Sequence, residues 1–503
     1  MKQAPISESA MIVSSAPSTS TPRAPYRRAR SAGGRLTGAP PVRAPDAEPS
    51  ACCLAASLAT SSTKCRQRRV SARSGFGAFR ASRPTLFGVA TSSRLLTART
   101  RRLDPGDPRH AARLVELLPG GPALSWVRDG DGLVGWGEAA RFDAAGPNRF
   151  AEADEWWQRL TQRFEVDDEV GLPGCGPVAF GSLAFADHPG GSALVVPEVL
   201  IGQRDGVRWI TTIGGATADP VLPAAPRSPG AVAFREGSAP AAHYREAVAE
   251  AVDRMRGGAE VAKVVLAHDL IAETAQPLDQ RYLLRDLAAR YPSCWTFAVD
   301  GLVGATPELL LERTGSEIRS QVLAGTAWPR PGRTTEELAA ELRASEKDRH
   351  EHDYAAESLA RRLRPFCAEL AVRGPEVLAL RNVLHLATDL AGRLDERAGA
   401  SLLRMVGAVH PTAAVGGTPT DAAVRLIDEL ERMDRDRYAG PVGWLDGRGN
   451  GQFGVALRCA QVRDREVRLF AGCGIVADSD PDLEVAEAQA KLRPIREALA
   501  PEG

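Results

Sequence analysis

The sequence lacks any apolar run long enough to span a membrane, and it lacks the compact apolar segment of a secretory signal. Its eight cysteines show no zinc-like spacing, which excludes a cysteine-based zinc framework and indicates reduced, structural thiols. These absences predict a cytoplasmic protein without a membrane partner.

Acidic residues are nearly absent from the first 100 positions, which hold 3 of the 63 Asp and Glu but 16 of the 63 Lys and Arg. The remainder is acidic, with 60 acids against 47 bases. Large apolar residues are also few in the basic segment, so it cannot bury enough surface to offset its ordering entropy. We predict a disordered extension rich in Ser, Ala, Pro and Arg over residues 1–103, and a folded domain over residues 104–503.

The basic extension has several interpretations. A nucleic-acid or membrane tether, a transit-like peptide, or translated sequence upstream of the true start would each give this composition. Nucleic-acid binding through the extension, the alternative from a different functional class, is disfavoured because few aromatic residues are interleaved with the arginines and no recognition helix follows them.

The folded part combines two kinds of pattern. Stretches rich in Val, Ile, Phe and Trp are separated by turn signals such as DGDG and GRGNG, which predict β-hairpins. Helical periodicity predicts helices at residues 243–258, 278–291, 334–343, 345–366 and 480–499. Because strands and helices do not alternate as βαβ units, we predict an α+β fold of large antiparallel β-sheets with helices packed outside, and an all-strand N-terminal half.

Two charged residues stand beside apolar strands. Lys263 begins KVVLAHDL, where alternation puts it on one face with Val265. On a core-facing row its desolvated amine would serve as a base near neutrality, whereas at a strand end in water it would be inert. Glu308, in GATPELLLER, would hold its proton and act as a general acid if partly buried, and would otherwise lie on a solvent face.

The helix predicted at SEKDRHEHDYAAE begins with a capping signal. Ser345 and Asp348 fit an N-cap box, and Glu351 shares a helix face with Asp348. Two carboxylates at this spacing repel unless a cation lies between them. The flanking histidines, His350 and His352, lack the i, i+4 spacing of a zinc helix.

The last predicted helix repeats this arrangement. Asp480 and Pro481 mark its start, and Glu484, Glu487 and Lys491 fall on one stripe. An exposed, salt-bridged face would explain either helix alone. Two helices that each offer an acidic pair could instead close on one hard cation, and oxygen-only ligands suit Mg²⁺.

Glycine-rich stretches and one arginine provide candidates for binding an anion. LAGTAWPR, HPTAAVGGTP and AGCGIV place small residues where backbone N–H groups can approach an anionic ligand, although turn geometry alone would also explain them. Arg458, predicted on a strand in GVALRCAQ, carries the fork that pairs bidentately with a carboxylate, unless it lies exposed on that strand.

Taken in order, these stretches resemble the chorismate-utilising enzymes, and most closely isochorismate synthase. The resemblance covers roughly residues 104–500 and rests on eight blocks in the family's order: KVVLAHDL, GATPELLLER, LAGTAWPR, SEKDRHEH, LHLATDLAG, HPTAAVGGTP, RYAGPVGWLDGRGNGQFGVALRCA and LFAGCGIVADSDPDLEVAEAQAKL. It implies the family's sandwich of two sheets and an Mg²⁺-dependent conversion of chorismate to isochorismate.

The resemblance also implies roles for particular residues. Lys263 stands where the family's lysine activates water, and Glu308 where its glutamate protonates the leaving hydroxyl. Glu351 and Glu487 match the acids that bind the metal ion directly. Asp348 and Glu484 match nearby acids that support the ion through water. Others match positions that line the substrate pocket: Gly325, Thr326, His385, Tyr438, Arg458, Gly472, Gly474 and Lys491.

Single residues show where this sequence differs from the family's pattern and which of the family's activities it favours. Trp328 stands where many relatives have arginine, so that loop is assigned no arginine role. Lys263 argues against the ammonia-using members and their glutaminase partner, and the small Ala414 fits the isochorismate branch. Salicylate synthase, which adds pyruvate elimination, is the alternative activity. We expect a monomer that serves menaquinone biosynthesis, with a siderophore pathway as the alternative.

Overall fold

The computed structural model describes residues 95–188, 190–218, 221–380 and 383–500, so residues 1–94 of the predicted extension lie outside the described residues. The strand β1, Leu96–Arg102, falls inside the range predicted as extension and pairs with two other strands. The predicted boundary at residue 104 is therefore too late. Composition concealed this strand because its arginines alternate with Ala98 and Thr100, whose side chains are fully buried.

The described strands form two large sheets. The 13-stranded sheet contains, in spatial order, β10 (Val232–Glu236), β11 (Lys263–Thr274), β22 (Glu466–Ile475), β21 (Cys459–Arg463), β13 (Leu302–Thr306), β12 (Trp295–Val299), β2 (Leu124–Arg128), β3 (Asp131–Trp136), β8 (Val199–Arg204), β9 (Val207–Ile213), β1 and β5 (Phe164–Asp168), with β18 (Gly417–Thr418) beside β11. The nine-stranded sheet contains β16 (Cys367–Leu380), β17 (Val383–Leu394), β15 (Glu317–Ala327), β14 (Leu309–Thr314), β20 (Gly451–Val455), β19 (Pro441–Asp446), β6 (Val178–Ser182), β7 (Gly191–Val196) and β4 (Ala140–Ala145).

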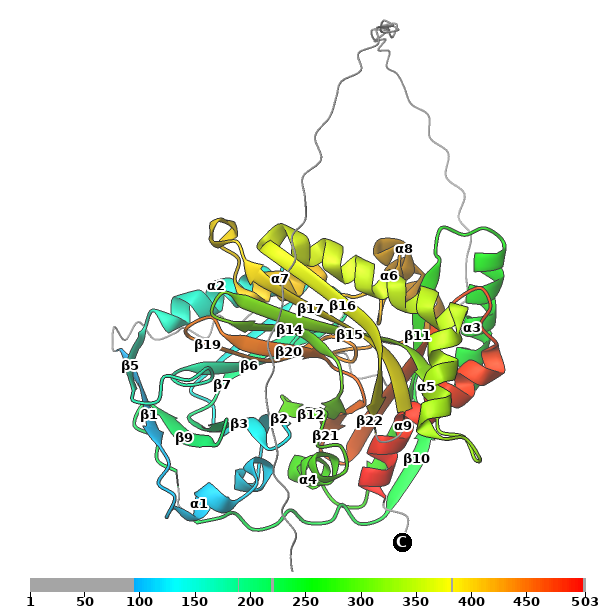
Figure 1. Ribbon diagram of the computed structural model, residues 1–503. Helices are drawn as coiled ribbons and strands as arrows, with labels where there is room; N and C mark the ends of the chain where they lie inside the picture. The colour runs from blue at the N-terminus through cyan, green and yellow to red at the C-terminus, as the bar shows by residue number, and fades with distance from the viewer. Residues whose placement is uncertain (1–94, 189, 219–220, 381–382, 501–503) are drawn as a thin grey trace, which may run out of the picture. The chain divides into compact units, whose positions relative to one another are not determined.

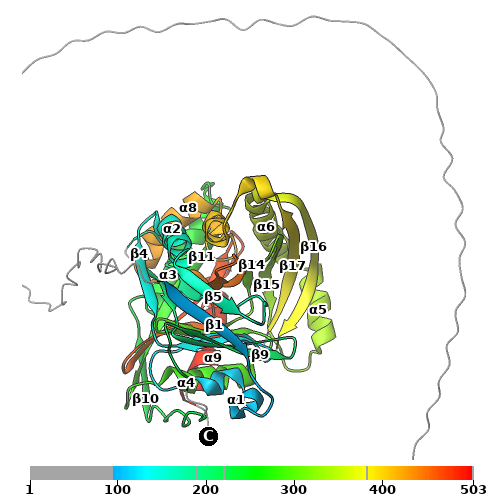
Figure 2. The ribbon, with the colours of Figure 1, turned by 90° about the vertical axis from the view of Figure 1, so that its left-hand side faces the viewer.

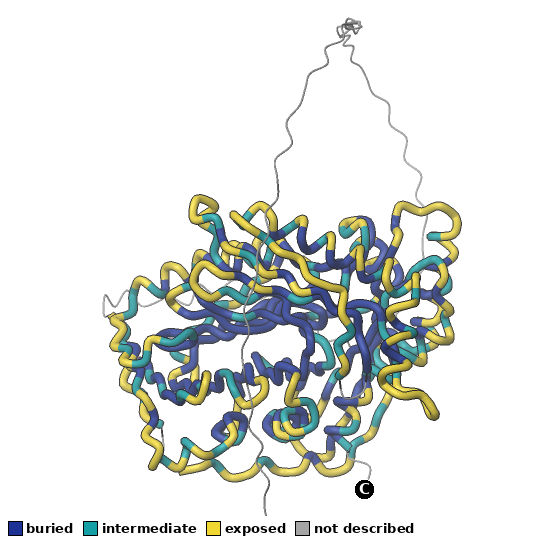
Figure 3. The backbone as a smooth tube through the Cα atoms, in the orientation of Figure 1, coloured by how far each residue is buried: buried dark blue, intermediate teal, exposed yellow. Residues whose placement is uncertain are grey.

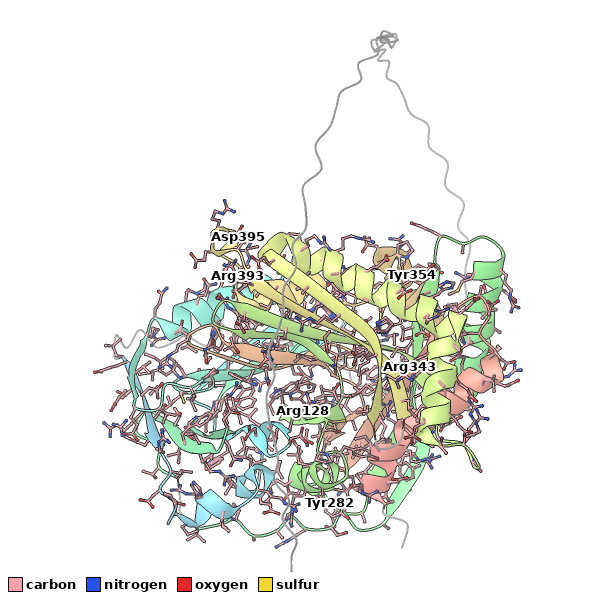
Figure 4. The ribbon with its side chains drawn as sticks, in the orientation of Figure 1. Arg128, Tyr282, Arg343, Tyr354, Arg393 and Asp395 are labelled. Carbon is pink, nitrogen blue, oxygen red and sulfur yellow. The ribbon has the colours of Figure 1, made fainter. Side chains whose placement is uncertain are left out.

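Antiparallel pairing dominates both sheets. Among the described strands only β1 and β5 pair in parallel. The predicted hairpins are present as β2–β3, β8–β9, β19–β20 and β21–β22, each closed by a short polar turn. The two sheets face each other, and their side chains fill the space between them (Figures 1 and 4).

Helices cover the outer faces of the two sheets (Figures 1 and 2). The described α-helices are α1 (Pro108–Ala111), α2 (Arg149–Thr161), α3 (Ala241–Arg256), α4 (Gln280–Arg290), α5 (Thr335–Ala344), α6 (Glu346–Leu363), α7 (Leu402–Val409), α8 (Thr420–Glu431) and α9 (Pro481–Leu499). Short 3-10 turns occur at Leu114–Leu117, Arg364–Phe366 and Glu396–Ala398. The helix α6 packs on β15 and β17, whereas α4 and α9 pack on β13 and β22 of the other sheet.

This architecture confirms the predicted α+β fold of antiparallel sheets with helices outside. The five predicted helices correspond to α3, α4, α5, α6 and α9. The all-strand N-terminal half is wrong, because α2 lies there and buries Trp157 and Leu160. The start of α6 follows the predicted capping, since the Ser345 hydroxyl accepts a hydrogen bond from the Asp348 N–H.

Most of the buried residues lie in the two sheets, whereas the outer sides of the helices are exposed (Figure 3). Tyr354, at the outer surface of α6, is 43% exposed (Figure 4). The described cysteines are free thiols, as predicted. In the described part of the chain, no helix combines the length and the apolar character that a bilayer span requires.

Candidate active site

A cavity of about 240 Å³ is lined by residues of both sheets and by the N-terminal parts of α6 and α9. Each predicted site residue except Lys263 lines it, and these residues are Glu308, Gly325, Thr326, Asp348, Glu351, His385, Tyr438, Arg458, Gly472, Gly474, Glu484, Glu487 and Lys491. The fold thus brings together side chains that lie up to about 180 residues apart in the sequence. Lys263 is not among the lining residues. It is fully buried next to two residues that do line the cavity, Glu351 and Gly474.

Lys263 begins β11 and is fully buried. Its Nζ lies 3.0 Å from Glu351 Oε1, which is an ion-pair distance. The contact lacks the alignment of a hydrogen bond, so within the described part of the chain Nζ has no hydrogen-bond partner. Of the two alternatives for Lys263, the structure shows the core-facing one. The polar contact of its ammonium group is the ion pair with Glu351.

Glu308 lies between β13 and β14, and only 4% of it is exposed. Burial raises the pKa of Glu308 from 4.5 to about 8, although the nearby Lys263 ammonium lowers it. The predicted solvent face is not observed here, because Leu310 on the same alternating row is also buried. A carboxyl group of this kind keeps its proton at neutral pH and can donate it.

The acids of α6 have different partners. Glu351 pairs with Lys263 and its side chain is 15% exposed. Asp348 caps its own helix together with Ser345, and its Oδ1 accepts a hydrogen bond from the Thr326 N–H at 3.3 Å. His352 is buried, with Nε2 2.6 Å from the Thr388 hydroxyl, so it has a structural partner.

The acids of α9 are paired with lysines. Glu487 Oε1 lies 2.8 Å from Lys491 Nζ, and Glu484 Oε1 lies 3.7 Å from Lys347 Nζ of α6. Burial raises the pKa of Glu484, and the neighbouring Glu487 carboxylate raises it further. Burial also raises the pKa of Glu487, but Lys491 outweighs it and the net pKa is below its ordinary value. Glu484 is buried and Glu487 is partly buried, and their carboxylates lie within 4.8 Å of each other, an arrangement that favours a cation between them.

These residues fit a hard divalent ion such as Mg²⁺. Four carboxylates from two helices line one end of the cavity, and three lysines supply compensating positive charge. The Cys473 thiol lies within 4.8 Å of the Glu484 and Glu487 carboxylates, but burial raises the pKa of Cys473 far above neutrality. The thiol therefore stays protonated, and the available ligands are oxygen atoms.

Another part of the cavity wall is formed by β15 and β17. His385 Nδ1 lies 3.4 Å from the Gly325 carbonyl oxygen and 3.3 Å from the Thr326 hydroxyl. Burial, together with Arg458 and Lys491, lowers the pKa of His385 to about 3, so the ring is neutral. Because a carbonyl oxygen only accepts, the contact with Gly325 requires the proton on Nδ1 and leaves Nε2 as an acceptor.

Arg458 is not on a strand, which corrects the prediction. The chain leaves β20 in one sheet and enters β21 in the other, and Arg458 lies in this crossing with a left-handed φ of 48°. Among the described residues no carboxylate lies within ion-pair distance of its guanidinium, which stands 5.9 Å from the Trp328 ring centroid. Burial lowers the pKa of Arg458, and a bound anion would offset that cost.

Gly474 and Tyr438 complete the wall near these charges. A Cβ atom at residue 474 would lie 2.5 Å from Glu351 Oε1 and 2.9 Å from Lys263 Cε, so only glycine leaves room for that ion pair. Tyr438 is buried and stacks on Phe470 with ring centroids 5.2 Å apart. The Gly472 carbonyl oxygen accepts a hydrogen bond from Lys491 Nζ at 2.9 Å.

Sequence reasoning missed two residues at this site. Arg435 lines the cavity and donates hydrogen bonds to the carbonyl oxygens of Val265 and Val415, while pairing with buried Glu431. The i, i+4 spacing of Glu431 and Arg435 suggests such a pair, but nothing in the sequence reveals its burial. The pairing of Lys347 with an acid of α9 depends on how the helices pack, and no local pattern could reveal it.

The cavity has a buried acid and two acidic helices. Comparisons with known proteins identify the family in which this chain belongs. The sequence profile of the family described as chorismate binding enzyme matches residues 90–219 and 223–500. The chain therefore belongs to the chorismate-binding enzyme family.

The similar proteins include named isochorismate synthases. The chain is 38% identical over 270 residues to isochorismate synthase DhbC of Bacillus subtilis, covering 51% of this chain and 67% of that protein. It is 37% identical over 346 residues to the putative isochorismate synthase MenF of Mycobacterium tuberculosis, covering 65% and 88%. The crystal structure of the putative 2,3-dihydroxybenzoate-specific isochorismate synthase DhbC from Bacillus anthracis covers 77% of this chain and 99% of that one, with 29% identity and a TM-score of 0.64. Anthranilate synthase component I of Streptococcus pneumoniae shares the fold, with 19% identity and a TM-score of 0.56.

Proposed function

We propose that this protein is an Mg²⁺-dependent isochorismate synthase, which adds water at C2 of chorismate and removes the C4 hydroxyl. The observation that carries the proposal is the protonated carboxyl of Glu308 at the wall of a cavity lined by four further acids, one of which, Glu351, is paired with the buried Lys263. The reaction needs a base for the attacking water and an acid for the leaving hydroxyl, which are the functions that Lys263 and Glu308 can supply.

Lys263, in its neutral amine form, would take the proton from the attacking water. Glu308 would protonate the departing hydroxyl, and its raised pKa keeps that proton available up to about pH 8. The double bonds of the ring shift between the two events, so the base and the acid must reach different sides of the ring. Lys263 begins β11, and Glu308 lies where the chain crosses from β13 to β14 of the other sheet, so the two groups come from separate segments, which supports this assignment.

The two carboxylates of chorismate would bind at different ends of the cavity. Glu351 and Glu487 would hold Mg²⁺, with Asp348 and Glu484 supporting it. When bound, the ion would supply positive charge for one substrate carboxylate and for charge that develops on it. The other carboxylate would pair with Arg458, which has no acidic partner among the described residues, with Tyr438 and backbone N–H groups nearby.

Several further properties are part of the proposal. The chain would act without a glutaminase partner, because water rather than ammonia is the nucleophile that Lys263 would activate. We expect a cytoplasmic monomer whose product enters menaquinone biosynthesis. A strain that lacks the gene should then grow normally when menaquinone is supplied, and a requirement for a catechol siderophore instead would assign the product to that pathway.

The direct test is incubation of the purified protein with chorismate and Mg²⁺, followed by chromatographic separation of the products. Isochorismate as the product, and its absence when EDTA replaces Mg²⁺, supports the proposal. Salicylate together with pyruvate would assign the salicylate synthase activity instead. Unchanged chorismate would reject both activities.

A further inference from the structure

Lysine is rare in this chain and concentrated at the cavity. The sequence contains five lysines, and the three in the described part of the chain each pair with one acid of the proposed metal site. Lys347 pairs with Glu484 and Lys491 with Glu487, and both lysines line the cavity. Lys263 differs because it pairs with Glu351 while lying behind the wall.

The position of Lys263 conflicts with its proposed role. A base that activates water must reach the cavity, but Lys263 is fully buried and is not among the lining residues. Its Nζ is held 3.0 Å from Glu351 Oε1, in the space that Gly474 leaves open. Nζ makes no hydrogen bond to any described residue, so this one charge contact is what retains it.

We propose that Glu351 exchanges Lys263 for the divalent ion, and that this exchange releases the lysine toward the cavity. The inference rests on the proposed function and adds that metal uptake is what makes the base available. A carboxylate that ligates a doubly charged ion interacts more weakly with a neighbouring ammonium group, because its charge is largely neutralised. Release of Nζ breaks the ion pair with Glu351 and gives up the packing of a fully buried side chain, but it costs no hydrogen bond.

The exchange explains why an acid of the metal site and the proposed base touch each other. Before the ion binds, Lys263 offsets the charge of Glu351, which is only 15% exposed and would be costly to leave unpaired. With the ion bound, the ammonium group and the cation would repel each other, which would favour movement of the lysine toward the cavity and the neutral amine form that can accept a proton. The base would therefore be withheld from the cavity until the ion is in place.

Amine labelling tests the exchange without measuring turnover. Reductive methylation followed by peptide mapping reports whether each lysine is accessible. In the metal-free protein we expect Lys263 to be protected and Lys347, whose side chain is 43% exposed, to be modified. Saturating Mg²⁺ should raise the labelling rate of Lys263 on the order of tenfold, because a buried amine otherwise reacts only through local opening.

Matched variants separate release from a general loosening of the fold. Glu351→Gln removes the charge that holds Lys263, so Lys263 should become labelled without Mg²⁺. Gly474→Ala keeps both charges but fills the space where they meet, and it should expose Lys263 in the same way. Glu484→Gln removes the charge that pairs with Lys347 and leaves the pair of Lys263 and Glu351 intact, so labelling of Lys263 in the metal-free protein should stay as in the wild type.

The outcomes distinguish this inference from the proposed function. Protection of Lys263 that is unchanged at Mg²⁺ concentrations supporting full isochorismate production would overturn the exchange and leave the function standing. Equal labelling of Lys263 in the metal-free wild type and in Glu351→Gln would also overturn it. Failure to convert chorismate at all would reject the function itself.

Discussion

Asp348 of α6 accepts a hydrogen bond from the Thr326 backbone N–H of β15, with 3.3 Å between Oδ1 and N. The bond forms where the pairing of β15 with β17 is irregular, between Ala324 and Thr326. Gly325 occupies this bulge with a φ of 74°. Asp348 therefore ties the first turn of an acidic helix to the strand that lines the cavity, in addition to capping that helix.

Replacing Gly325 by alanine should disturb this junction. The new Cβ would lie 3.0 Å from Asp348 Cβ, and the left-handed φ adds backbone strain of about 1 kcal/mol. We expect lower stability and lower turnover. Gly399→Ala is the matched control, because Gly399 also has a left-handed φ, of 54°, but open space around it. Urea unfolding should show a larger loss for Gly325→Ala, and equal losses would contradict the close contact.

The raised pKa of Glu308 predicts how activity depends on pH. Glu308 donates a proton in the proposed reaction, so kcat should fall as pH rises through about 8. In Glu308→Gln the rate should drop by about 100-fold or more, and the remaining rate should lose this alkaline decline. Steady-state rates between pH 6 and 9 measure both effects. An unchanged alkaline decline in the variant would assign it to another group.

The same group predicts a pH-dependent stability. Between its ordinary pKa of 4.5 and about 8, folded Glu308 keeps a proton that the unfolded chain has lost. Rising pH therefore destabilises the wild type by up to about 1.4 kcal/mol per pH unit over this window. Glu308→Gln avoids this cost and should gain stability relative to the wild type from pH 5 to pH 8. Urea unfolding at pH 5 and pH 8 measures this gain. The same stability difference between Glu308→Gln and the wild type at both pH values would contradict the raised pKa of Glu308.

Arg458 should matter for binding rather than for folding. It has no carboxylate partner among the described residues, so Arg458→Met removes the proposed pairing with the substrate without leaving an acid unpaired. We expect chorismate affinity to fall by about 10- to 100-fold, which corresponds to a charged hydrogen-bonded contact. Arg397→Met is the control, because that side chain is 91% exposed. Calorimetric titration that gives equal affinities for the two variants would exclude the pairing.

Local sequence patterns predicted the elements of the site better than its contacts. Alternation and capping signals located β11, the start of α6 and the acidic stripe of α9, because each depends on neighbouring residues. Whether Lys263 and Glu308 were buried stayed open, since burial depends on packing between strands distant in the sequence. The structure decides both cases in favour of burial.

The errors have physical causes as well. Arg458 was expected on a continuous strand because GVALRCAQ alternates well, but the chain changes sheets there. β1 was missed because arginine dominates its exposed side. The contact between Lys263 and Glu351 could not be predicted, because it depends on a glycine that lies more than 120 residues beyond Glu351.

The most direct test of the account is the position of a divalent ion. Crystals of the protein soaked with Mn²⁺ in place of Mg²⁺ would locate it by anomalous diffraction. The account predicts one ion with carboxylate oxygens of both Glu351 and Glu487 as ligands, at roughly 2.0–2.2 Å, with Lys263 Nζ no longer against Glu351. An ion bound by the acids of one helix alone, or no ion beside a bound substrate in an active enzyme, would contradict it.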